Sequence, residues 1–129
     1  MLELKEYQKR TVREFESYLR SIRQFGSEKG HDIGFYMSTQ IKYKSQGLGK
    51  VPYVCIKIPT GGGKTLVAWH LLNSIYEKFA ESRNQKGLAL WLVPTTAIKT
   101  QTIDALKDRN HPYRETLDRK FSNNILIMN

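Results

Sequence analysis

Residues 58–65 read IPTGGGKT, and this stretch decides which fold the sequence predicts. It overlaps the end of the apolar run YVCIKI, residues 53–58, and closes with Lys64 and Thr65. Consecutive glycines allow the backbone to turn tightly and to present N–H groups that no side chain shields. A helix that begins near Lys64 would add its positive N-terminal end. The stretch therefore indicates a phosphate-binding loop between a strand and a helix.

The polar residues of this loop suit the phosphates of a nucleotide. Lys64 is expected to reach the β- and γ-phosphates, and the Thr65 hydroxyl to ligate Mg²⁺. The general pattern requires glycine at position 58, where this chain has Ile58, so the match is to a variant. The alternative is a glycine-rich turn that ends in Lys-Thr by chance. The predicted nucleotide-binding residues of the loop are Thr60, Gly61, Gly62, Gly63, Lys64 and Thr65.

Apolar runs and periodicity on both sides of the loop predict alternating strands and helices. Buried strands are expected over residues 53–58, 88–93 and 124–129, and helices over 64–80 and 96–107. Continuously apolar strands that alternate with helices indicate a parallel sheet covered by helices, with right-handed crossovers. The predicted fold class is therefore α/β, a three-layer parallel sheet that is incomplete in this chain.

The segments outside this core are less regular. Residues 3–25 have apolar side chains at a spacing of three and four, which predicts a long amphipathic helix. Gln8 lies on the inward face of that helix, where an amide needs a partner, and Gly26 is the expected stop. Residues 26–52 contain five glycines and are expected to form an irregular insertion. Residues 111–121 are expected to hold one short helical turn.

Composition limits the possible classes of protein. The chain has 129 residues, which suits one domain, and no apolar run approaches the roughly 20 residues that span a bilayer. Its charged N-terminus argues against secretion, so we expect a cytoplasmic protein without a membrane partner. Cys55 is the single cysteine, which excludes an internal disulfide. The net charge of +9 suits a polyanion such as nucleic acid, although a solvated basic surface would have the same charge.

Three segments together resemble superfamily 2 helicases and translocases, the DEAD/DEAH-like group. PTGGGKT, at 59–65, resembles motif I of that group. LKEYQKRTV, at 4–12, looks like the upstream segment in which a glutamine reads adenine, and Gln8 is the matching residue. LWLVPTTAIKTQT, at 90–102, looks like motif Ia, whose turn meets the nucleic-acid backbone. The residues that match this turn are Pro94, Thr95 and Thr96, and either threonine would equally suit the cap of the following helix.

The closest resemblance is to the Res subunit of type III restriction enzymes, in which PTGGGKT, LWLVP and an HPYR-like segment occur together. HPYR stands at 111–114 of this chain and has no role that we can assign from the sequence. The resemblance implies a RecA-like P-loop NTPase fold, with ATP and Mg²⁺ as cofactors. It also implies double-stranded DNA as substrate, a DNA methyltransferase subunit as partner, and a nuclease activity as an option for the parent protein.

The resemblance also implies a division of the chain. Residues 1–129 would be the N-terminal part of the first RecA-like motor domain. Within it, residues 1–25 would form the adenine-motif helix, 26–52 an insertion and 53–129 the P-loop core. No Asp-Glu pair follows any predicted strand, so we expect no catalytic residue within these 129 residues and no ATP turnover by them alone.

Two alternatives remain at the level of the sequence. One is a different P-loop protein, such as a small nucleotide kinase, which would need acceptor-site arginines and a lid. The other is a module that binds nucleotide or nucleic acid without hydrolysis. An Asp-Glu pair after a further apolar run of the parent protein would favour the motor.

Overall fold

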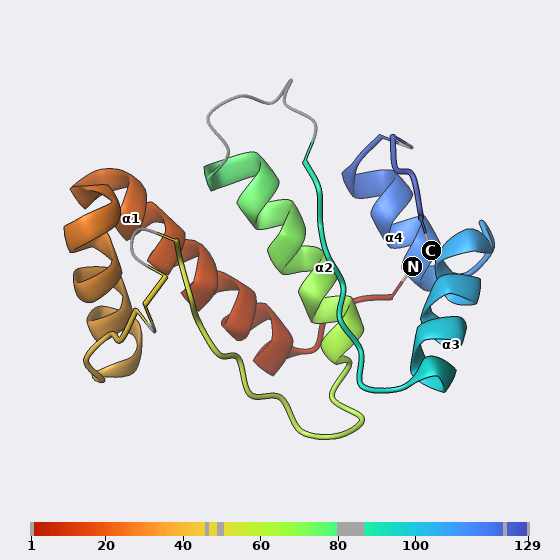
Figure 1. The fold of residues 1–129 in the computed structure, drawn as a ribbon, viewed down its shortest axis with the longest axis horizontal. Helices are drawn as coiled ribbons and strands as arrows, with labels where there is room; N and C mark the ends of the chain where they lie inside the picture. Colours follow the sequence, from red (N-terminus) through yellow and green to blue (C-terminus); the bar gives the residue numbers. More distant parts are fainter. Residues whose placement is uncertain (1, 46, 49–50, 80–86, 123, 129) are drawn as a thin grey trace. The chain divides into compact units, whose positions relative to one another are not determined.

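The computed structural model describes residues 2–45, 47–48, 51–79, 87–122 and 124–128 (Figure 1). The chain divides into two compact units. The N-terminal unit, Lys5–Gln85, contains α1 (Glu6–Thr39), α2 (Lys64–Ser74) and the π-helix η1 (Ile75–Phe79). The C-terminal unit, Lys86–Asn129 with Met1–Leu4, contains α3 (Thr96–Lys107) and α4 (Pro112–Lys120).

Helix α1 consists of two arms that meet at Gly26, residues 6–25 and 27–39 (Figure 1). Gly26 has φ 80° and ψ 163°, a backbone conformation that essentially only glycine adopts. After this reversal, Gly30 lies against the backbone of the first arm. A Cβ atom at position 30 would stand 2.6 Å from the Ser21 carbonyl oxygen and 2.9 Å from the Ile22 nitrogen. The two arms therefore pack at a distance that only a glycine permits.

Aromatic side chains fill the space between the arms and the chain that follows them. Tyr18 is buried, and its hydroxyl lies 2.8 Å from Nδ1 of His31. The His31 ring stacks on Tyr43, with ring centroids 5.1 Å apart and planes inclined by 10°. Desolvation, aided by Tyr43, raises the pKa of Tyr18 above its ordinary value of 10.0, so its hydroxyl keeps its proton. The Tyr43 hydroxyl in turn accepts a hydrogen bond of 3.0 Å from the backbone N–H of Tyr53, which anchors the segment that leads to the glycine loop.

The first arm of α1 also packs against α2 and η1. Glu16 accepts a hydrogen bond of 2.8 Å from the Ser74 hydroxyl and forms an ion pair of 2.5 Å with Lys78. Desolvation raises the pKa of Glu16, but the hydrogen bonds from Lys78 and Ser74 outweigh this effect, and the pKa lies below its ordinary 4.5. Arg23 adds a hydrogen bond of 3.4 Å to the Lys78 carbonyl.

The predicted α/β fold is wrong for this structure. The described residues form five helices and contain no strand, so they contain no parallel sheet and no three-layer arrangement. The segments expected as buried strands are irregular at 53–58, 88–93 and 124–128, while position 129 lies outside the described residues. Their apolar side chains are largely exposed, as Leu88 (86%), Leu92 (82%) and Leu126 (80%) show. A strand exists only where a neighbouring backbone supplies ladder hydrogen bonds. An apolar run indicates a preference for burial but does not identify that neighbour.

The helical predictions were more successful than the strand predictions. The predicted helix over 96–107 is confirmed as α3, with the same bounds. The helix over 64–80 corresponds to α2 followed by η1 as far as Phe79, and position 80 lies outside the described residues. Residues 27–39 are helical, although an irregular segment was expected there, and α4 is longer than one turn. In the parts of the chain that the structure describes, no helix combines the length and apolar character needed to cross a membrane.

Candidate nucleotide-binding site

The glycine loop begins with a tight turn. The backbone N–H of Gly62 donates to the Pro59 carbonyl at 2.9 Å, which closes a four-residue turn. Gly61 occupies the third position of that turn with φ +74°, a position and sign that favour glycine. Gly63 has φ +72° and is the N-cap of α2. The first and third glycines of the loop are therefore required by the backbone conformation.

The middle glycine is required by its neighbours. Its carbonyl accepts two hydrogen bonds of 2.8 Å, one from the Tyr7 hydroxyl and one from Nε2 of Gln8. A Cβ atom on Gly62 would collide with the side chain of Ile58 and would stand 2.8 Å from the Pro59 carbonyl oxygen. The first turn of α1 thus holds the loop through a single carbonyl group, and no side chain fits at that point.

Gln8 is buried, with 4% of its surface exposed, as its position on the inward face of the helix predicts. Its Oε1 accepts a hydrogen bond of 2.8 Å from the Lys5 backbone N–H, while its Nε2 donates to Gly62. A primary amide has two N–H donors and two acceptor lone pairs, so one of each is still available after these bonds. Recognition of adenine by Gln8 therefore stays a prediction that is compatible with this geometry.

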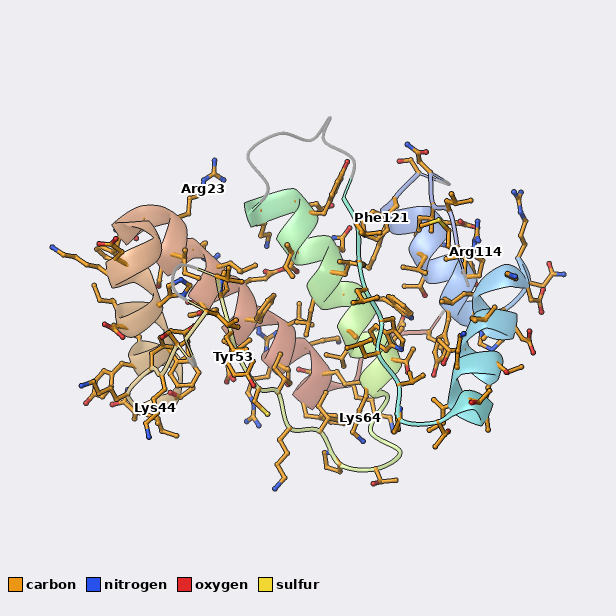
Figure 2. The ribbon with its side chains drawn as sticks, in the orientation of Figure 1. Arg23, Lys44, Tyr53, Lys64, Arg114 and Phe121 are labelled. Carbon is orange, nitrogen blue, oxygen red and sulfur yellow. The ribbon has the colours of Figure 1, made fainter. Side chains whose placement is uncertain are left out.

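The polar residues after the glycines lie at the start of α2, where Figure 2 shows Lys64. Lys64 is exposed, and its Nζ donates to the Pro59 carbonyl at 3.1 Å. Thr65 is half-buried and Thr60 is exposed. The N-cap residue provides no side-chain hydrogen bond, so the N–H groups of the first turn of α2 are not capped by a side chain. This combination of backbone donors, a helix N-terminus and an ammonium group is the donor set that suits phosphate.

The residues expected to contact nucleic acid lie in the C-terminal unit. Thr95 is the N-cap of α3, and its hydroxyl oxygen accepts a hydrogen bond of 3.3 Å from the Ile98 backbone N–H. Capping is therefore one role of Thr95, as the sequence also suggested. The capping bond uses an oxygen lone pair and leaves the hydroxyl proton for a second partner. Pro94 and Thr96 are exposed beside it.

The described residues offer no group of carboxylates that could coordinate a metal ion beside Thr65. These residues contain no cluster of three or more His, Cys, Asp or Glu side chains able to hold a metal ion. Asp104 is on α3 and Asp108 directly follows that helix, in the C-terminal unit. The loop motif names Thr65 as a ligand of Mg²⁺ bound with the nucleotide, and this stays a prediction.

The structure brings part of the predicted site together. Gln8 contacts Gly62, which is 54 positions later in the sequence, and a Cβ atom on Gly63 would stand 2.5 Å from the Gln8 Nε2. Tyr7 was not predicted as part of the site. Tyr7 belongs to the apolar face that the spacing predicts for residues 3–25, but nothing in the sequence indicates that its hydroxyl reaches the loop.

Comparison with known proteins agrees with the resemblance of the sequence motifs. The protein family described as type III restriction enzyme, res subunit, matches residues 1–127. Searches of curated proteins and of solved structures gave no match. The family match covers both compact units, including the glycine loop, the Thr95 turn and the HPYR segment. The chain therefore belongs to the family of type III restriction enzyme res subunits.

Proposed function

We propose that the glycine loop binds the phosphates of ATP together with Mg²⁺, and that the chain is the ATP-binding part of an ATP-dependent DNA translocase or helicase. One observation supports this most directly. The loop from Gly61 to Gly63 joins the N-terminus of α2, which carries Lys64, and α1 holds it at the Gly62 carbonyl. Membership of the family supports a parent enzyme of this class, with DNA as its substrate.

The residues of the loop fit a nucleotide phosphate in their chemistry. The uncapped N–H groups at the start of α2 would donate to phosphate oxygens, and the helix dipole favours a negative charge there. Lys64 has three N–H donors, of which the bond to Pro59 uses one. We propose that Lys64 neutralises the β- and γ-phosphates and that Thr65 helps to hold Mg²⁺, which would offset the phosphate charge during hydrolysis in the parent enzyme.

The second proposed contact is with the DNA backbone. The turn at Pro94–Thr96 would meet a phosphate through the hydroxyl protons of its two threonines and through the N-terminus of α3. The net charge of +9 supports binding to a polyanion. A contact of this kind positions the protein on DNA without reading its sequence. A methyltransferase subunit as partner, and the division of the chain into adenine-motif helix, insertion and P-loop core, also remain proposals.

Lys64→Ala tests the phosphate-binding role. We expect ATP–Mg²⁺ affinity to fall at least about tenfold, because a charge-assisted bond to phosphate is lost. The fold should stay intact, since the Lys64 side chain is exposed and makes one bond within its own loop. Isothermal titration calorimetry measures the affinity, and far-UV circular dichroism checks the helices.

Lys57→Ala is the matched control, because Lys57 is an exposed lysine of the same segment that precedes the loop. It removes the same charge and should leave the affinity for ATP–Mg²⁺ unchanged. Equal affinities of Lys64→Ala and the unsubstituted chain would reject the phosphate-binding role of the loop. Equal losses in both variants would mean that only the overall charge matters.

A further inference from the structure

The HPYR segment, residues 111–114, builds the start of α4. His111 is the N-cap, and its Nδ1 accepts a hydrogen bond of 3.2 Å from the Tyr113 backbone N–H. Pro112 occupies the first helical position, where its missing N–H costs nothing. The rings of His111 and Tyr113 meet edge to face with centroids 5.0 Å apart. The first three residues of the motif therefore fix where α4 begins.

The fourth residue, Arg114, joins α4 to the end of α3. Its side chain is 10% exposed, and its Nε donates to Oδ1 of Asp118 at 2.8 Å. Its Nη1 donates to the Leu106 carbonyl at 3.1 Å. Leu106 lies in the last turn of α3, where carbonyl groups lack partners within the helix and where a positive charge is favourable. Arg114 thus satisfies a carbonyl at the C-terminus of α3 from the neighbouring helix.

Arg114 is not placed to contact DNA itself. Its guanidinium group is directed at two internal acceptors and is nearly buried, whereas the Arg119 side chain on the same helix is 60% exposed. Only an arginine has separate N–H groups in a rigid fork that can reach a carboxylate and a carbonyl together. Lysine would keep the charge but would not make both hydrogen bonds, to Asp118 and to Leu106, in this geometry.

We propose that Arg114 is a positioning residue for the DNA contact at Pro94–Thr96, a role that rests on the proposed function of that turn. The twelve residues of α3 connect the two points, with the Thr95 cap at one end and the Leu106 carbonyl at the other. A helix of this length moves as one body, so the packing that fixes its C-terminus also fixes the direction of its N-terminus. HPYR then acts on DNA through α3.

Arg114→Lys tests this role because it conserves the net charge. We expect duplex DNA, followed by fluorescence anisotropy, to bind roughly 5- to 10-fold more weakly at every salt concentration, since charge-assisted bonds are lost. The slope of affinity against salt should not change, because the substitution conserves every positive charge and the slope depends on the phosphates that lysines and arginines neutralise. Arg119→Lys, the same substitution at an exposed position of α4, should bind as the unsubstituted chain does.

A double-mutant cycle with Thr95→Ala separates positioning from simple stabilisation. If Arg114 acts through the Thr95 turn, Arg114→Lys should weaken DNA binding less than about twofold in the Thr95→Ala background. Additive losses, or no loss in Arg114→Lys alone, would overturn the inference and leave the proposed function intact. Failure of the unsubstituted chain to bind DNA would reject both. If circular dichroism shows that Arg114→Lys loses helix, Asp118→Asn takes its place in the cycle, with the same expected coupling and the same contrary result.

Discussion

Two glycine-rich regions of the N-terminal unit use the same residue type for different physical reasons. Residues 61–63 are adjacent in the sequence, and two of them need a positive φ. Gly26, Gly30 and Gly34 are spaced by four positions, and only the first has a positive φ. The other two are helical, and a Cβ atom at either would stand within 2.6 Å of an atom of the first arm of α1.

The difference shows that the spacing of glycines carries more information than their number. Residues 26–52 were predicted to be irregular because they contain five glycines and show little sustained periodicity. Glycine is also costly in helix interiors, by about 1 kcal/mol relative to alanine. That cost is offset where the absent Cβ allows two helical arms to approach closely and to bury the cluster of Tyr18, Leu19 and Ile22. A spacing of four places the glycines on one face of a helix, which is the arrangement that such packing requires.

Gly30→Ala should produce the largest effect. It tests whether the two arms of α1 need glycine at position 30 in order to pack closely. Alanine favours a helix, but its Cβ would meet the backbone of Ser21 and Ile22, which cannot move aside as a side chain can. We expect a net loss of about 2 kcal/mol in the free energy of unfolding, as for other overpacked sites. Chemical denaturation followed by circular dichroism measures it.

The matched control for that change is Asp32→Ala, at an exposed position of the same arm. It introduces the same side chain and should change stability by no more than about 0.5 kcal/mol. A Gly30→Ala protein that is as stable as this control would mean that the two arms are not packed at backbone contact in solution.

Gln8→Ala tests the other region, where the loop is held by side chains of α1. We expect ATP affinity to fall by about 1–2 kcal/mol, because one of the two hydrogen bonds to the Gly62 carbonyl and the predicted adenine contact are both lost. GTP affinity should fall less, because GTP has no adenine contact to lose and would be affected only by the missing hydrogen bond to the Gly62 carbonyl. Calorimetric titration with both nucleotides measures the difference.

Gln24→Ala provides the control, since Gln24 is an exposed glutamine of the same arm of α1. It should bind both nucleotides as the unsubstituted chain does. Equal losses of ATP and GTP affinity in Gln8→Ala would mean that Gln8 only supports the loop through the Gly62 carbonyl. They would exclude adenine recognition by Gln8.

Glu16→Gln should have the smallest effect. It concerns the contact of α1 with α2 and η1, where Glu16 is bonded to Ser74 and Lys78. The pKa of Glu16 is lowered in the folded protein, so its ionised form stabilises the fold above its ordinary pKa of 4.5. This contribution is lost as the pH falls through the lowered value. At pH 7 we expect the variant to be less stable by about 1 kcal/mol, because Glu16 is bonded to Ser74 and Lys78.

Thermal unfolding from neutral pH to below 4.5 checks this pH dependence. The difference between Glu16→Gln and the unsubstituted chain should close on the acid side. Glu14→Gln, which removes a more exposed carboxylate 3.9 Å from Arg10, should show a smaller difference at every pH. A difference that is constant over this range would mean that the charge of Glu16 is not what stabilises the contact.

The local features of the chain could be predicted from the sequence alone. The bounds of α3, the helix that begins at Lys64 and the glycine turn before it all depend on residues within one or two helical turns of each other. The inward face of the first helix also indicated that Gln8 is buried, although not which distant residue covers it. The prediction of a parallel sheet was wrong, because the described residues contain no strand. Apolar runs at 53–58 and 88–93 specify side-chain character, while a strand depends on a partner that the run itself does not contain.

The sequence by itself therefore determined where most helices form and which residues make up the glycine loop. Tertiary structure alone decided that Tyr7 and Gln8 meet the Gly62 carbonyl, 55 and 54 positions away, and that Arg114 reaches Leu106. The physical reason is that dihedral preferences and amphipathic spacing act between near neighbours. A hydrogen bond between distant residues forms only when packing brings its donor and acceptor to the same place.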